Sequence, residues 1–109
     1  MQEATLREVC AKYKVSRRAV QGYEKAGIVK PSGKNKMGYL LYDTATQERI
    51  GIIRMYQDIG FSVREIKEII DAPKISANPI LEKQLEKLKK ERSRIEEQIE
   101  ILYDLIQKS

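Results

Sequence analysis

The residues best suited to binding chemistry lie near the N-terminus, in the run Ser16-Arg17-Arg18 followed by Gln21. Arginine guanidinium groups donate paired hydrogen bonds to phosphate oxygens and guanine edges, and a glutamine amide pairs similarly with adenine. On one short helix, Arg17 and Arg18 would stand on the first turn and Gln21 one turn further on. The pattern predicts a helix that enters the major groove of DNA, with Ser16, Arg17, Arg18, Gln21 and Tyr23 as candidate contacts.

A second basic segment follows this helix. Lys34 and Lys36 lie in a glycine-containing run between two β-like stretches, residues 28–31 and 39–42. We predict a hairpin whose basic tip brings both lysines to the DNA backbone. Tyr39 and Tyr42 are expected to anchor its base, and Tyr39 is also a candidate DNA contact. A surface hairpin without a binding role is the alternative.

Residues for catalysis or metal binding are scarce. The chain has no histidine, its only cysteine is Cys10, and no carboxylate pair or glycine-rich phosphate loop stands in a convincing context. We therefore expect a free, half-buried thiol, no metal site, no cofactor and no enzymatic activity.

Charge is distributed unevenly along the 109 residues. Residues 1–42 hold nine Lys and Arg against three Asp and Glu, a balance of +6 within a total of +5. Such a basic N-terminal third fits contact with phosphates, although a solvated basic face would look the same. No apolar stretch is long enough to cross a bilayer, and a polar segment follows Met1. We expect a cytoplasmic protein without membrane contact.

Capping residues predict the helices that must position these side chains. Thr5 with Glu8 forms a capping-box pattern for a helix to Tyr13, and Ser16 can cap a second helix that ends at Gly27. Two short helices joined by so tight a turn are typical of a helix-turn-helix. With the hairpin, they predict a mainly α, winged helix-turn-helix domain.

Two further helices complete the predicted domain, residues 1–71. One begins at Asp43 or Thr44 and runs through residue 59, with a buried side expected to contain Ile50, Ile53, Met55 and Tyr56. Another follows a capping-box pair at residues 62 and 65 and ends near residue 71. Residues 72–78, with Pro73, are expected to form a linker.

Residues 79–109 contain apolar residues at alternating spacings of four and three, which predicts a long coiled-coil helix. The predicted dimerisation seam is Leu81, Leu85, Leu88, Arg92, Ile95, Ile99, Leu102 and Ile106. So long a helix could not bury its seam against a small head, so a partner helix is expected. An antiparallel pair would bring the more apolar C-terminal end onto the other subunit's third and fourth helices and give a two-fold homodimer.

Several fragments, in order, resemble MerR-type transcription regulators. They are Leu6-Arg7-Glu8-Val9, Val15-Ser16-Arg17-Arg18, Tyr23-Glu24-Lys25-Ala26-Gly27-Ile28, Gly38-Tyr39-Leu40-Leu41-Tyr42 and Ile59-Gly60-Phe61-Ser62-Val63-Arg64-Glu65-Ile66. The resemblance covers nearly the whole chain. It implies a homodimer, joined by an antiparallel coiled coil, that binds double-stranded DNA between two promoter elements and distorts it so that RNA polymerase engages.

The sequence departs from the family pattern in the predicted DNA contacts. Members commonly have Arg-Tyr-Tyr where this chain has Gln21-Gly22-Tyr23, and Arg where it has Leu40. The cysteines of the family's metal sensors, near the start of the long helix, are also missing. Either a fragment of a larger regulator or a minimal regulator fits the length. The alternative function is a coiled-coil interaction adaptor whose basic head does not bind DNA specifically.

Overall fold

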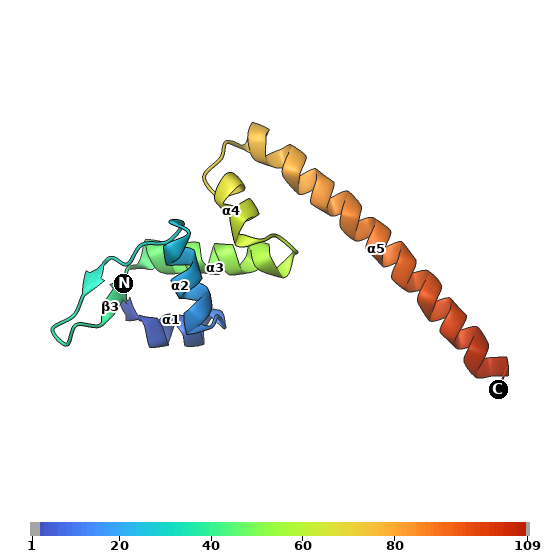
Figure 1. The fold of residues 1–109 in the computed structure, drawn as a ribbon, viewed down its shortest axis with the longest axis horizontal. Coiled ribbons are helices and arrows are strands. Elements are labelled where there is room, and N and C mark those ends of the chain that lie inside the picture. Colours follow the sequence, from blue (N-terminus) through green and yellow to red (C-terminus); the bar gives the residue numbers. More distant parts are fainter. Residues whose placement is uncertain (1–2, 109) are drawn as a thin grey trace. The chain divides into compact units, whose positions relative to one another are not determined.

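The computed structural model describes residues 3–108, so the outermost residues of the two predicted domains, 1–2 and 109, lie outside the described part. The chain divides into two compact units, Met1–Asp71 and Ala72–Ser109. The order of elements is β1 (Ala4–Thr5), α1 (Leu6–Tyr13), α2 (Arg17–Lys25), β2 (Gly33–Lys34), β3 (Leu40–Tyr42), α3 (Thr44–Asp58), α4 (Val63–Ile69) and α5 (Lys74–Lys108) (Figure 1). The predicted fold class, a winged helix-turn-helix followed by a long helix, is confirmed.

The helices of the first unit begin where the capping residues predict. Thr5 and Ser62 each form a complete capping box with the glutamate three positions later. Ser16 and Asp43 accept hydrogen bonds from backbone amides in the first turns of α2 and α3. Each cap satisfies an amide that would otherwise lack a partner, which stabilises a helix start by about 1 kcal/mol.

One hydrophobic core draws on every helix of the first unit. Its fully buried side chains are Val9, Val20, Tyr23, Tyr42, Ile50, Ile53 and Ile66. The prediction that Met55 is buried is wrong, because 51% of that residue is exposed. Met55 lies two positions from the buried Ile53, which turns it about 200° around the helix to the outer side of α3.

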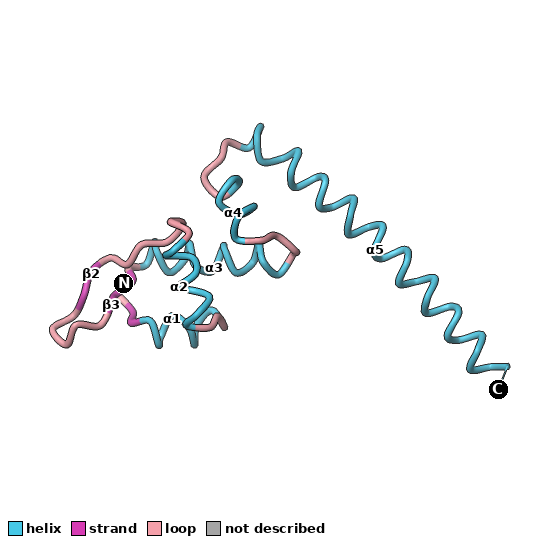
Figure 2. The backbone as a smooth tube through the Cα atoms, in the orientation of Figure 1, coloured by secondary structure: helices cyan, strands magenta, loops and turns pink. Residues whose placement is uncertain are grey.

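The sheet differs from the prediction. It has three short antiparallel strands in the order β1-β3-β2, and β1 was not predicted (Figure 2). The predicted strand at 28–31 is wrong, because β2 begins only at Gly33. Ile28 and Val29 are both buried, so their apolar character reflects the core rather than strand pairing. Tyr42 pairs with Ala4, 38 positions earlier, which no local pattern could reveal.

The second unit consists chiefly of α5, a helix of 35 residues that would measure about 52 Å. It starts at Lys74, so the predicted linker at 72–78 is wrong for most of its length, and Pro79 lies inside the helix. The first turn closes on Pro73, whose carbonyl accepts hydrogen bonds from the amides of Ser76 and Ala77. Proline favours the first turn, but here the long helix tolerates one missing amide donor further on. No helix within residues 3–108 combines the length and apolarity needed to cross a membrane.

Candidate nucleic-acid interface

The inner face of α2 belongs to the core. Val20 and Tyr23 are 0% and 1% exposed, and the Tyr23 hydroxyl donates a hydrogen bond to Oε1 of Gln57 in α3. Burial raises the pKa of Tyr23. The Tyr23 side chain therefore lies in the core, because a residue three positions after a core valine shares its face of the helix, and its predicted contact with DNA stays a prediction.

The outer face of α2 carries the other predicted contacts. Ser16, Arg17, Arg18 and Gln21 are all exposed. Neither arginine forms an ion pair with any residue in the described range 3–108, so both guanidinium groups are open to an external anion. Ser16 uses its Oγ to accept the Ala19 amide 2.9 Å away, so its first role is to cap the helix.

Polar contacts hold α2 and the chain after it in place. The Tyr42 hydroxyl donates to Oε2 of Glu24 at 2.6 Å, which joins β3 to α2. Burial, reinforced by the Glu24 carboxylate, strongly raises the pKa of Tyr42. This arrangement fixes the end of α2 against the sheet, so its outer face is presented on a rigid support.

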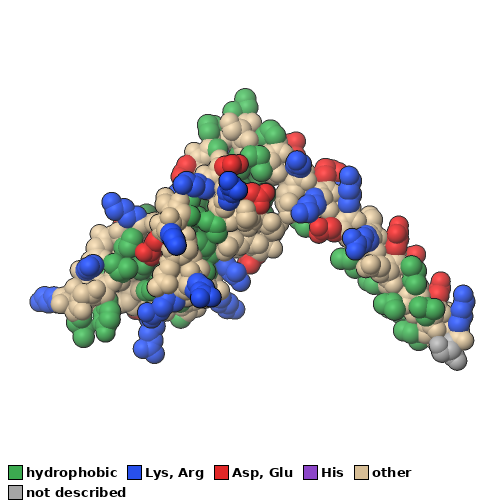
Figure 3. Space-filling model, viewed as in Figure 1, with side chains coloured by type: hydrophobic (Ala, Val, Ile, Leu, Met, Phe, Trp, Pro, Cys, Tyr) green, Lys and Arg blue, Asp and Glu red, His purple; other side chains and the backbone are tan. Residues whose placement is uncertain are grey.

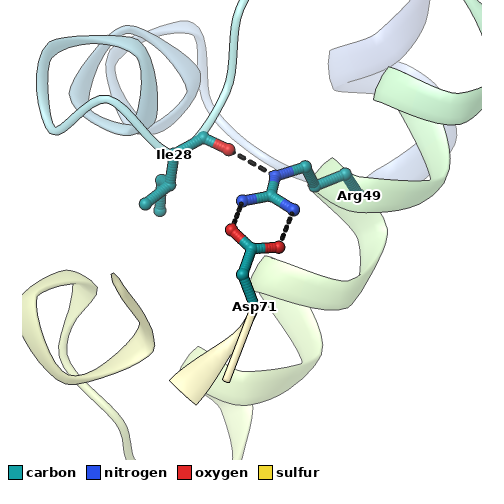
Figure 4. A network of polar contacts seen from close by, with 3 residues as sticks. All are labelled: Ile28, Arg49 and Asp71. Atoms are coloured by element: carbon teal, nitrogen blue, oxygen red, sulfur yellow. Dashed lines mark hydrogen bonds and ion pairs between the residues drawn. The ribbon is translucent and has the colours of Figure 1, made fainter. Parts of the chain in front are cut away.

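Arg49 of α3 holds the chain just beyond α2. Its Nε donates to the carbonyl oxygen of Ile28, and its two terminal nitrogens donate to the two carboxylate oxygens of Asp71, each at 2.8 Å (Figure 4). These hydrogen bonds lower the pKa of Asp71 and raise that of Arg49. One planar guanidinium thus joins three segments of the first unit.

The wing, defined as residues 32–42, is organised by Asn35. Its Oδ1 accepts the amides of Met37 and Tyr39 at 2.9 and 3.0 Å, and Gly38 takes the left-handed conformation with φ of 84°. Lys34, at the end of β2, and Lys36, in the turn, are both exposed. The prediction that Tyr42 anchors the wing is confirmed, but for Tyr39 it is wrong, because Tyr39 is 58% exposed. Tyr39 remains free to contact a ligand.

The wing, α1 and α2 together enclose a groove of about 540 Å³. Arg7 of α1 and Arg17 of α2 both line it, beside Gln21 and Tyr39. Arg7 was not among the predicted binding residues. Its position off the apolar face of α1 was the one available signal, and the other cations of the N-terminal third likewise lie off the apolar helix faces or in loops and strands of the wing. Figure 3 shows one face of this unit, on which Lys and Arg side chains outnumber acidic ones.

Comparison with known proteins agrees with this geometry. The sequence model described as the MerR HTH family regulatory protein matches residues 4–73. The chain belongs to the MerR family. A second model, described as MerR, DNA binding, matches residues 47–108, so the two matches extend across both units. The family consists of transcription regulators rather than enzymes.

Individual MerR-family relatives cover different shares of the chain. The HTH-type transcriptional activator mta of Bacillus subtilis is 35% identical over 88 residues, which are 81% of this chain and 34% of that protein. A probable heavy metal-dependent transcriptional regulator of Haemophilus influenzae is 32% identical over 69 residues, 61% of this chain and 54% of that protein. The chain thus spans about a third to a half of the length of these curated relatives.

A solved structure supports the same assignment. The crystal structure of MtaN, the N-terminus of the multidrug transporter activator of Bacillus subtilis, matches with a TM-score of 0.71 at 31% identity. The match covers 94% of this chain and 97% of that chain. A MerR-family transcriptional regulator from Bacillus cereus gives a TM-score of 0.74 at 27% identity, covering 88% and 74%.

Proposed function

We propose that this MerR-family protein is a sequence-specific DNA-binding transcription regulator that acts as a homodimer on a pseudo-palindromic promoter site. The observation that carries the proposal is the exposed cationic face of α2, supported from behind by the Tyr23 and Tyr42 hydrogen bonds and flanked by the basic wing. A rigid helix with unpaired arginines on its first turn suits the major groove.

The proposed contacts divide between bases and backbone. Arg17 and Arg18 reach phosphates or guanine edges from the first turn of α2, and Gln21 reads adenine one turn later. In the wing, Lys34 and Lys36 contact the backbone, because an exposed ammonium serves as a point charge for phosphate. The exposed parts of Ser16 and Tyr39 add hydroxyl groups at the margin of this surface.

The proposal of a homodimer rests on the exposed seam of α5. Seam residues Leu85, Ile95, Leu102 and Ile106 are 51%, 54%, 58% and 69% exposed, and the neighbouring Ile101, Tyr103 and Leu105 widen this apolar surface. Burial of apolar surface contributes about 25 cal/mol per Å², so a partner helix on this seam would be strongly favoured. The Arg92 side chain is 70% exposed, and its Nε lies 3.8 Å from a carboxylate oxygen of Glu96 on the same helix. This ion pair gives the arginine a partner at its seam position.

Charge polarity along α5 favours the antiparallel pairing. Residues 74–92 hold six Lys and Arg against three Glu, a balance of +3, whereas residues 93–108 hold two against four, a balance of −2. In a parallel pair, the positive half of each helix would lie beside the positive half of its partner, and the two negative halves would also meet. An antiparallel pair sets the positive half of each helix beside the negative half of its partner. The seam spacing, four and three in alternation, reads the same from either end and therefore fits this arrangement.

A two-fold dimer carries two copies of α2, so we propose two inverted half-sites as its target. From the family resemblance we also propose that the dimer distorts the DNA between the half-sites. RNA polymerase is then its partner at the promoter. The proposed site of action is accordingly the cytoplasm, where that polymerase works.

Selection of bound fragments from the source genome tests the proposal and yields the operator. With that fragment, the double substitution of Arg17 and Arg18 by alanine is expected to abolish specific binding while the dimer persists. The matched control replaces Lys83 and Lys90, which lie on the outer side of the seam in α5, and removes the same charge. If wild-type protein selects no fragment, or if the two double variants bind alike at moderate salt, the adaptor function is favoured instead.

A further inference from the structure

The groove between α1, α2 and the wing combines cationic and apolar walls. Leu6 and Arg7 line it from the first turn of α1, and Arg17 lines it from the first turn of α2. Tyr39 and Leu40 of the wing close the remaining edge. The two consecutive helices α1 and α2 and the later wing therefore meet around one opening.

The charge of this groove is wholly positive. No aspartate or glutamate is among the described residues that line it. The nearest acidic neighbour of Arg7 in sequence, Glu8, is turned back onto Thr5, accepting hydrogen bonds from its amide and hydroxyl at 2.9 and 3.0 Å. Arg7 itself is exposed and forms no ion pair with a residue in the described part of the chain. Two uncompensated guanidinium groups from different helices that line one groove favour the binding of an anion there.

We propose that this groove holds one phosphodiester of the DNA backbone between Arg7 and Arg17, which makes Arg7, on the first helix of the helix-turn-helix, a phosphate-binding residue outside α2 and the wing. The inference rests on the proposed DNA-binding function. A phosphodiester has two unbridged oxygens, one for each guanidinium, and the carbons of its deoxyribose match the apolar surface of Leu6 and Leu40.

The groove also separates the roles of the two arginines of α2. Arg17 lines the groove and contacts the backbone, whereas Arg18 lies outside the lining and is left to read bases. A backbone strand held between α1 and α2 fixes the register in which α2 enters the major groove. Contacts of this kind position a protein on DNA without carrying sequence information.

The test compares Arg7→Ala with Lys12→Ala, binding the operator fragment obtained from the genome. Lys12 is the matched control, because it is an exposed cation on the same helix but lies outside the groove. Each phosphate contact contributes about 0.9 to the slope of log K against log salt concentration, so a dimer with two grooves should lose about two from that slope in Arg7→Ala. The affinity should fall by about tenfold per groove, equally for all operator variants. Lys12→Ala should change neither quantity appreciably.

Neutral methylphosphonates placed one at a time along the operator identify the phosphate. Neutralisation of one position per half-site should weaken wild-type binding more than it weakens binding of Arg7→Ala, in which only Arg17 still contacts that phosphate. If a methylphosphonate at each position weakens the binding of Arg7→Ala as much as it weakens the binding of wild type, then Arg7 acts through a free anion or through general charge. That result would overturn the inference. So would equal salt slopes for Arg7→Ala and Lys12→Ala. In both cases wild-type binding to the operator would still stand, whereas failure of the proposed function would appear as no operator at all.

Discussion

Two glycines on different helices provide a direct test of the packing between α1 and α3. A Cβ added at Gly22, on α2, would meet nothing within 4 Å. A Cβ added at Gly51, on α3, would lie 2.7 Å from Cε1 and 2.9 Å from Cδ1 of Tyr13, at the end of α1. Both glycines are helical, so the two alanine substitutions share one favourable contribution and differ by one steric contact.

The magnitudes follow from these distances. Alanine is favoured over glycine inside a helix by about 1 kcal/mol, so Gly22→Ala should raise the free energy of unfolding by about that amount. Gly51→Ala gains the same contribution but forces the half-buried Tyr13 ring to move, and overpacking of this kind costs about 1–3 kcal/mol. The two variants should therefore differ by about 1–3 kcal/mol, with Gly51→Ala the less stable.

Urea denaturation followed by circular dichroism measures the difference, at one fixed protein concentration because dimerisation couples to stability. A double-mutant cycle isolates the contact: in a Tyr13→Ala background, Gly51→Ala should no longer be destabilising. Equal stabilities of Gly22→Ala and Gly51→Ala would refute the packing of Tyr13 against α3. An unchanged penalty in the Tyr13→Ala background would refute its assignment to the ring.

Two further predictions concern the Arg49 junction and the α5 seam. Hydrogen bonds from Arg49 lower the pKa of Asp71, so their stabilisation is present above the ordinary aspartate pKa of 3.8 and is lost as pH falls through the lower folded value. The stability gap between wild type and Asp71→Asn, from urea titrations at several pH values, should therefore close in acid; a gap independent of pH would contradict this. Leu88→Glu should yield monomers by sedimentation, because it sets a charge in the apolar seam, whereas Lys90→Glu on the outer side should remain dimeric. A dimeric Leu88→Glu protein would count against the seam assignment.

The amino-acid sequence alone determined the features that depend on neighbours three or four positions apart. The caps at Thr5, Ser16 and Ser62 and the repeat of the long helix are of this kind, because their hydrogen bonds and packing periods are local. The fold class followed from their order, and the basic outer face of α2 from its helical spacing.

Only the tertiary structure decided which side chains of similar character are buried and which are exposed. Tyr23 and Tyr42 enter the core while Tyr39 stays outside, a difference that depends on packing of Tyr23 against α3 and of Tyr42 against α2 rather than on residue type. In the same way, Arg7 became a groove residue only because α1 meets α2 and the wing. Contacts across long stretches of chain are set by the shape of the whole core, and no short pattern in the sequence records them.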